Sequence, residues 1–154
     1  MNVTLLDEQD DPLEPSLLVE LAEAVMVAEA LPADTELAIH IVDTVRMAEL
    51  NERHLGKVGP TDVLSFPIES LSPGEVPIAL EDGPPPTIGD VLICPSVVRQ
   101  NAGDAGVAFD DELALMVVHG VLHLLGYDHV DDEDAERMEA RERQLLAGAG
   151  RIRP

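Results

Sequence analysis

The sequence predicts a single α+β domain in which a small mixed sheet packs with about five helices. Its 154 residues match the length of one domain with its own core. Short stretches of alternating polar and apolar residues predict strands, and longer segments whose apolar residues recur at helical spacing predict helices. The elements follow one another as β-α-β-α-β-β-α-α-α, without a repeat or a linker. We therefore expect one domain over residues 1–154.

The first half of the chain is expected to contribute three strands and two helices. The strands are expected at residues 2–6, 36–42 and 63–66, the first of them at an edge of the sheet. The helices are expected at residues 17–30 and from about 44 to 53. Pro32 stops the first of these helices, and Asp43 or Thr44 can cap the second.

The second half is expected to contribute one strand and three helices after a long loop. Residues 69–86 are rich in Pro, Gly and acidic residues, so we expect an exposed excursion there; its Pro-rich part, 72–86, has no assigned role. A strand is expected at 87–94, and the three helices from Pro95, at 112–125 and at 132–146. Asp110 is expected to cap the middle helix, and Gly126 to end it.

The charge of the chain is unusual. Nine basic residues stand against 31 acidic ones, which gives a net charge of −22. A surface this acidic repels phosphate and counts against a nucleic-acid binder, and its simplest interpretation is a solubilising surface. The first residues do not resemble a signal peptide, and no apolar run could span a bilayer, so we expect a cytoplasmic protein without a membrane partner.

The residues that indicate chemistry lie between positions 110 and 129, which read DDELALMVVHGVLHLLGYDH. His119 and His123 are four residues apart, so a helix places both imidazoles on one face. Gly126 lets the chain turn back, and His129 can then add a third ligand. Three imidazoles are the ligand set of a catalytic zinc site, so we expect one Zn²⁺ per chain.

Three protein ligands leave one position of a tetrahedral zinc open for water, whose pKa the metal lowers. The sequence therefore predicts a hydrolase that uses zinc-bound water. We assign no side chain as the general base, and we expect Asp128 to orient a ligand from outside the coordination sphere. A structural zinc is the alternative, with Cys94 or Asp128 as a fourth ligand.

The histidine helix is distantly metzincin-like, because it differs by one residue from the His-Glu-x-x-His pattern of zinc peptidases. Those enzymes use the glutamate as a general base, but Gly120 occupies that position here. A peptidase that works by that route is therefore disfavoured. A substrate whose own phosphate or hydroxyl assists the reaction fits better.

Several blocks of this sequence resemble the YbeY family of bacterial endoribonucleases. The block HGVLHLLGYDH at 119–129 closely resembles the family signature, and PTDVLSFP at 60–67 resembles a second block. Weaker similarity covers GDVLIC at 89–94, MAELN at 47–51, and the pair Met138 and Glu142. The blocks follow the family's order and span most of residues 35–146.

This resemblance implies the family's α+β fold and a metal-dependent, single-strand-specific endoribonuclease with zinc on His119, His123 and His129. It also implies action on ribosomal RNA precursors, notably at the small-subunit 3′ end, and in ribosome quality control. The expected partners are RNA and the ribosome or small-subunit assembly factors. A zinc metallopeptidase-like hydrolase, a non-catalytic assembly factor with a structural zinc, and an enzyme active only on the ribosome remain alternatives.

One departure from the family concerns phosphate binding. Many members carry an arginine shortly before the second block, at the position that Leu55 occupies here. Arg53 and Lys57 lie two residues on either side and are candidates to replace it. The remaining candidates for substrate binding lie in the second block, where a strand could line a groove beside the metal: Thr61, Asp62 and Ser65. Alternatively, Thr61 and Asp62 only satisfy a turn.

Overall fold

Four strands form one mixed sheet in the order β1-β2-β4-β3 in the computed structural model, which describes residues 1–154. The strands are β1 (Asn2–Asp7), β2 (Glu36–Ile41), β3 (Val63–Pro67) and β4 (Thr87–Ile93). β1, β2 and β4 run parallel, whereas β3 pairs antiparallel with β4. β1 lies at an edge of the sheet, as expected, and β3 forms the other edge.

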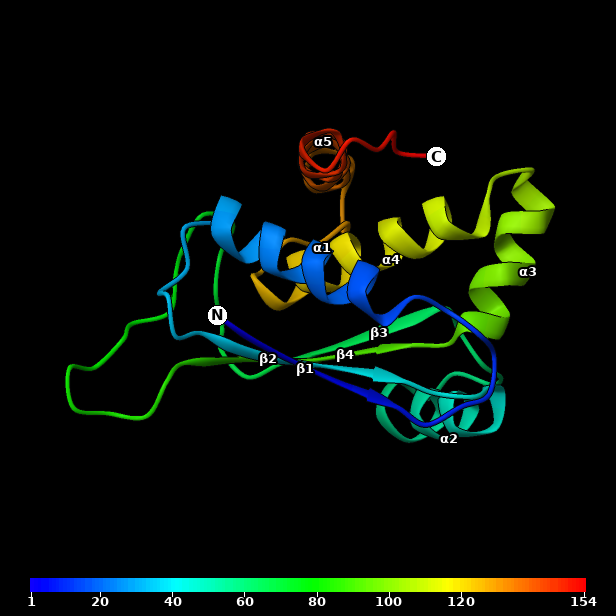
Figure 1. Ribbon diagram of the computed structural model, residues 1–154, viewed down its shortest axis with the longest axis horizontal. Helices are drawn as coiled ribbons and strands as arrows, with labels where there is room; N and C mark the ends of the chain where they lie inside the picture. Colours follow the sequence, from blue (N-terminus) through cyan, green and yellow to red (C-terminus); the bar gives the residue numbers. More distant parts are fainter.

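Five helices surround this sheet, which confirms the predicted fold class. They are α1 (Pro15–Ala28), α2 (Thr44–Leu55), α3 (Pro95–Ala105), α4 (Phe109–Leu124) and α5 (Asp132–Gly148). Figure 1 shows α1 and α4 on one face of the sheet, α5 beyond them, and α2 on the opposite face. None of the helices is both long and apolar enough to cross a membrane.

Two apolar clusters follow from this arrangement. The larger contains 27 buried residues, most of them from α1, α4, α5 and one face of the sheet. The smaller contains six residues between α2 and the other face of the sheet, Cys94 among them. Cys94 is fully buried and unpaired, so it serves as a small apolar core residue.

The ends of the helices test the cap predictions. Asp43 caps α2, because its carboxylate accepts a hydrogen bond from the backbone N–H of Arg46 at 2.8 Å. The prediction that Asp110 caps α4 was wrong, because the helix begins at Phe109 and its N-cap is Ala108. Asp110 already lies in the first turn, where its charge still favours the positive end of the helix dipole.

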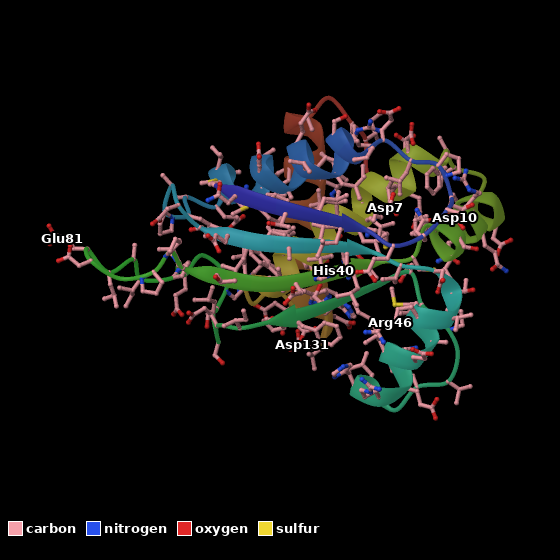
Figure 2. All side chains as sticks on the ribbon, turned by 60° about the horizontal axis from the view of Figure 1, so that its bottom comes forward. Asp7, Asp10, His40, Arg46, Glu81 and Asp131 are labelled. Carbon is pink, nitrogen blue, oxygen red and sulfur yellow. The ribbon has the colours of Figure 1, made fainter.

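Residues 68–86 connect β3 to β4 without a helix or strand, as expected for the Pro-rich loop. In Figures 1 and 2 this segment extends as an arm beyond the end of the sheet, with Glu81 near its tip. The first residues of this arm still pack against the body of the protein. There the carbonyl oxygen of Leu71 approaches Gly126 so closely that a Cβ would lie 2.0 Å from it.

Candidate metal centre

The last turns of α4 and the segment after it bring three histidines together. His119 and His123 lie on one face of α4, and His129 lies in the irregular segment that follows the turn at residues 125–126. One ligand atom from each comes within 4.8 Å of the other two. This is the only group of three or more potential metal ligands so placed in the protein.

The turn that carries His129 depends on Gly126. This residue has φ +95°, a left-handed conformation that L side chains rarely adopt, and the backbone of Leu71 leaves no room for a Cβ. The helix therefore ends just before Gly126, as predicted, and the chain reverses toward the cleft. A short-range sequence signal thus positions the third histidine.

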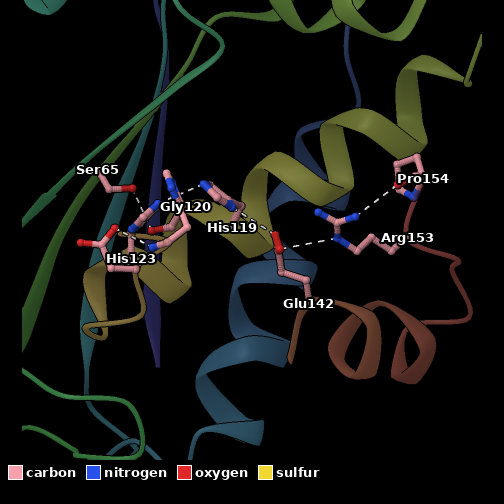
Figure 3. Close-up of polar contacts among 9 residues, drawn as sticks. Ser65, His119, Gly120, His123, Glu142, Arg153 and Pro154 are labelled. Atoms are coloured by element: carbon pink, nitrogen blue, oxygen red, sulfur yellow. Dashed lines mark hydrogen bonds and ion pairs between the residues drawn. The ribbon is translucent and has the colours of Figure 1, made fainter. Parts of the chain in front are cut away.

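A buried carboxylate holds the first histidine from behind. Figure 3 shows Glu142, from α5, between His119 and Arg153. Its Oε2 lies 3.1 Å from Nδ1 of His119, and its Oε1 lies 3.5 Å from Nε of Arg153. Only 1% of Glu142 is exposed. The sequence suggested Glu142 only as a match to a family block, because its contact with His119 spans 23 residues.

This contact determines which nitrogen of His119 can bind a metal. A carboxylate accepts a hydrogen bond from Nδ1–H, so the proton of the neutral ring stays on Nδ1 and Nε2 keeps its lone pair. That Nε2 lies 3.0 Å from Nε2 of His123. Ligand nitrogens about 2.0–2.1 Å from a tetrahedral zinc are roughly 3.3–3.4 Å apart, so this spacing is close to the one the metal needs.

Burial favours the neutral, metal-binding form of His123. Desolvation lowers the pKa of this imidazole, and the charges of His119 and His129 lower it further, whereas Asp128 raises it. Neutral imidazoles are the form that coordinates zinc. The residues present therefore fit a zinc ion with three nitrogen ligands.

The structure places Asp128 beside the centre but not against an imidazole. One of its carboxylate oxygens accepts a hydrogen bond from the backbone N–H of His129 at 2.8 Å. It thus fixes the main chain that carries the third histidine. Neither Asp128 nor Cys94 belongs to the group of mutually close ligand atoms. Cys94 lies in the small cluster under α2, so a closed four-ligand site built with it is not supported.

The three histidines line an open cleft of about 430 Å³ between α4 and the edge strand β3. Residues 62–67 form its other wall, so the predicted candidates Asp62 and Ser65 lie in it, together with Leu55. Arg53, Lys57 and Thr61 do not line it, and no lysine or arginine does. Arg53 and Lys57 are exposed.

The polar residues of the second block are largely engaged within the protein. Oδ1 of Asp62 accepts hydrogen bonds from the backbone N–H of Val63 at 2.8 Å and the hydroxyl of Thr61 at 3.2 Å. Its Oδ2 accepts one from Asn101 at 3.3 Å. The hydroxyl of Ser65 donates to the carbonyl of Gly120 at 2.9 Å (Figure 3). Thr61 and Asp62 therefore order the start of β3, and Ser65 joins β3 to α4.

Gly120 explains how closely α4 packs on the sheet. A Cβ at this position would lie 2.6 Å from Cγ1 of Val91 and 3.3 Å from Cγ2 of Val63. A glutamate here would have to displace the buried side chain of Val91, because its own side chain would start inside the core. The position that carries the general base in zinc peptidases is thus closed by packing, as well as occupied by glycine.

The remaining histidines, His40 and His54, lie outside the cleft. His40 lies on β2, and its Nε2 is 2.9 Å from Asp90 on β4. Figure 2 shows this face of the sheet, with Arg46 on the neighbouring α2. His54 lies near the end of α2 and packs edge-on against Phe66, with ring centroids 4.9 Å apart.

Comparisons with known proteins agree with these observations. The family model described as endoribonuclease YbeY matches residues 7–150. A protein named endoribonuclease YbeY from Acidothermus cellulolyticus is 44% identical over 148 residues, which cover 95% of this chain and 90% of that protein. The protein of the same name from Nocardioides sp. is 40% identical, over 96% of this chain and 97% of its own length.

A solved structure shares the fold. The solution structure of a protein from Thermotoga maritima matches with a TM-score of 0.58 and 28% sequence identity. The match covers 96% of this chain and 91% of that one. The similarity therefore extends over the whole fold.

Proposed function

This chain belongs to the endoribonuclease YbeY family, and we propose that it is a zinc-dependent endoribonuclease specific for single-stranded RNA. We propose that it matures ribosomal RNA precursors, including the small-subunit 3′ end, and takes part in ribosome quality control in the cytoplasm. Its proposed partners are RNA and the ribosome or small-subunit assembly factors. The observation that carries the proposal is the cluster of three histidines at the wall of an open cleft.

The histidines would hold one zinc ion, with His119 and His123 binding through Nε2. When bound, zinc would supply a Lewis acid that withdraws charge from a phosphoryl oxygen and lowers the pKa of a water molecule. Glu142 accepts a hydrogen bond from Nδ1–H of His119 and so holds the ring in the tautomer whose Nε2 can bind a metal. The Ser65 hydroxyl fixes β3 against the helix that carries two of the ligands.

Two carboxylates line the cleft, and only Asp128 has an oxygen that makes no hydrogen bond within the protein. Asp62 also lines the cleft, but both of its oxygens accept hydrogen bonds from the protein. Asp128 uses only Oδ1, for the His129 N–H, and its Oδ2 is free. We therefore propose that Oδ2 of Asp128 receives the proton that the attacking oxygen loses.

The packing of Gly120 favours a phosphodiester over a peptide as the bond that is cleaved. A zinc peptidase of the His-Glu-x-x-His type needs a carboxylate at this position, and the core excludes one. The zinc metallopeptidase-like hydrolase remains the second candidate for a hydrolytic role. A non-catalytic assembly factor with a structural zinc is the third.

Metal analysis and RNA cleavage, measured together, test the proposal. We expect about one zinc per chain in protein prepared without chelators, lost in His119→Ala and in His129→Ala. Wild-type protein should cut single-stranded RNA, and both variants should remain folded and inactive. A preparation without any transition metal would refute the metal centre. Zinc-loaded protein that cuts neither naked RNA nor pre-ribosomes would refute the endoribonuclease.

The same experiment separates the alternatives. If the zinc is structural, His123→Ala should unfold the protein, which circular dichroism detects. Cleavage of peptides without cleavage of RNA would indicate a peptidase.

A further inference from the structure

The free edge of β3 presents backbone hydrogen-bonding groups to the cleft that the histidines line. β3 is an edge strand, so half of its backbone N–H and C=O groups have no neighbouring strand. All five residues of β3 also line the histidine cleft. The unpaired groups of this strand are therefore available to a molecule bound in the cleft.

The hydrogen bonds at the two ends of β3 show which residues face the free edge. The N–H of Cys94 donates to the carbonyl of Asp62 at 2.9 Å, and the N–H of Ile68 donates to the carbonyl of Ile88 at 3.1 Å. In an antiparallel pair, residues alternate between those that bond to the partner and those that point away. The even-numbered residues of this segment therefore bond to β4, and residues 63, 65 and 67 face the cleft edge.

Only one of these three residues has a free N–H group. The N–H of Val63 is occupied, because it donates to Oδ1 of Asp62 at 2.8 Å. Pro67 has no N–H at all, and this edge position tolerates it because no ladder bond is needed there. Ser65 is left as the single outward-facing donor, held in place by the bond from its hydroxyl to Gly120.

We infer that the backbone N–H of Ser65 donates a hydrogen bond to a non-bridging oxygen of the RNA phosphate bound at the histidines. The inference rests on the proposed function and names a contact to its substrate. A fixed N–H group aimed at an oxygen that gains charge in the transition state is an effective stabiliser, because it needs no reorganisation. No lysine or arginine lines this cleft, so a main-chain N–H group is a donor that a phosphate oxygen can use there.

The number of donors favours a phosphate over an extended peptide. A peptide that adds to a sheet edge needs alternating donors and acceptors along several residues. This edge supplies one free N–H, flanked by an occupied one and a proline, which is enough for one phosphate oxygen. The outward carbonyls of Val63 and Ser65 are acceptors, and the 2′-hydroxyls of a ribose-phosphate backbone are matching donors.

Nuclear magnetic resonance of the zinc-loaded wild-type protein tests the contact without any mutation. In the free protein, the Ser65 amide should exchange with solvent at least about tenfold faster than the ladder amides of Leu64 and Phe66. A non-cleavable single-stranded 2′-O-methyl oligoribonucleotide should shift the Ser65 amide proton downfield and slow its exchange. The amide of Val63, already bonded to Asp62, serves as the internal control and should not gain protection.

A pair of variants tests the effect on catalysis. Ser65→Pro removes the N–H and the hydroxyl, whereas Ser65→Ala removes only the hydroxyl. Pro should fit, since Pro67 occupies the next outward position of the same strand. With zinc content equal, we expect kcat of Ser65→Pro to fall about 10- to 100-fold below that of Ser65→Ala. This loss is somewhat smaller than the roughly 100- to 1000-fold loss of kcat that follows removal of one oxyanion-hole donor.

The outcomes separate this contact from the proposed function. If wild-type protein cuts RNA but the Ser65 amide neither shifts nor gains protection, the contact does not exist. Equal kcat in two folded, zinc-loaded variants would also overturn it. A shift caused by a peptide but not by the oligonucleotide would assign the edge to peptide pairing instead. Absence of RNA cleavage by the wild type would refute the proposed function, which the variants do not address.

Discussion

Replacing Glu142 with alanine should weaken zinc binding although Glu142 touches no metal position. Its carboxylate is 3.1 Å from Nδ1 of His119 and is almost completely buried. Without this carboxylate, Nδ1–H of His119 has no hydrogen-bond acceptor among the side chains around it. The ring can then rotate, or place its proton on Nε2, which cannot bind metal while protonated.

The expected size of the effect follows from the role of such carboxylates. Loss of the outer partner of a metal-bound histidine costs about 10- to 100-fold in affinity, which is about 1.4–2.7 kcal/mol. Glu142→Gln keeps an oxygen at the same place but loses the charge. We expect its loss of affinity to lie at the lower end of that range, because a neutral acceptor makes a weaker hydrogen bond.

Arg153→Ala is the matched control for the ion pair. Arg153 contacts the other oxygen of the same carboxylate at 3.5 Å and does not touch His119. Its removal should lower the melting temperature while zinc affinity falls much less than in Glu142→Ala. Competition with a chromophoric zinc chelator at constant pH measures the affinities, and circular dichroism follows unfolding. Wild-type affinity in a folded Glu142→Ala variant would refute the reasoning, as would an equal loss in Arg153→Ala.

Three further predictions concern packing, capping and charge. Gly120→Ala should destabilise the protein by about 1–3 kcal/mol in denaturant titrations, because the new Cβ would approach Val91 to 2.6 Å. Asp43→Ala should cost about 1 kcal/mol through loss of the α2 cap and leave zinc content unchanged. If Arg53 and Lys57 bind phosphate, each alanine variant should weaken RNA cleavage and reduce the salt dependence of binding by about 0.7 in logarithmic slope, with zinc retained. Unchanged slopes and rates would remove both from the substrate site.

Local sequence signals predicted most of the fold, because they act over a few residues. Alternating and helical periodicity located the four strands and five helices, and Asp43 marked the start of α2 correctly. The start of α4 was placed too late, since an acidic first turn resembles a cap in sequence. Ala108 is the N-cap because its backbone is extended, and its side chain makes no capping hydrogen bond that the sequence could indicate.

The histidines were predictable for the same reason. Two are one helical turn apart, and Gly126 signals the turn that returns the third. Glu142 could not be given a role from the sequence alone, since it is one of several glutamates on an amphipathic helix and meets His119 only through the packing of α5 on α4. The Ser65 N–H depends on strand register, which periodicity does not supply.

The acidity of the chain bears on where the proposed enzyme would act. At physiological ionic strength charges are screened over about 8 Å, so most of the net charge of −22 acts on the approach of RNA rather than on its contacts in the cleft. Within the cleft, Asp62 is bonded to the protein, Asp128 is the one carboxylate with a free oxygen, and the Ser65 N–H offers a neutral donor. The enzyme can therefore bind naked RNA weakly and still cleave the RNA that reaches the cleft efficiently. A ribosomal precursor supplies basic proteins that attract the acidic surface, so cleavage should be faster there than on the same RNA free in solution.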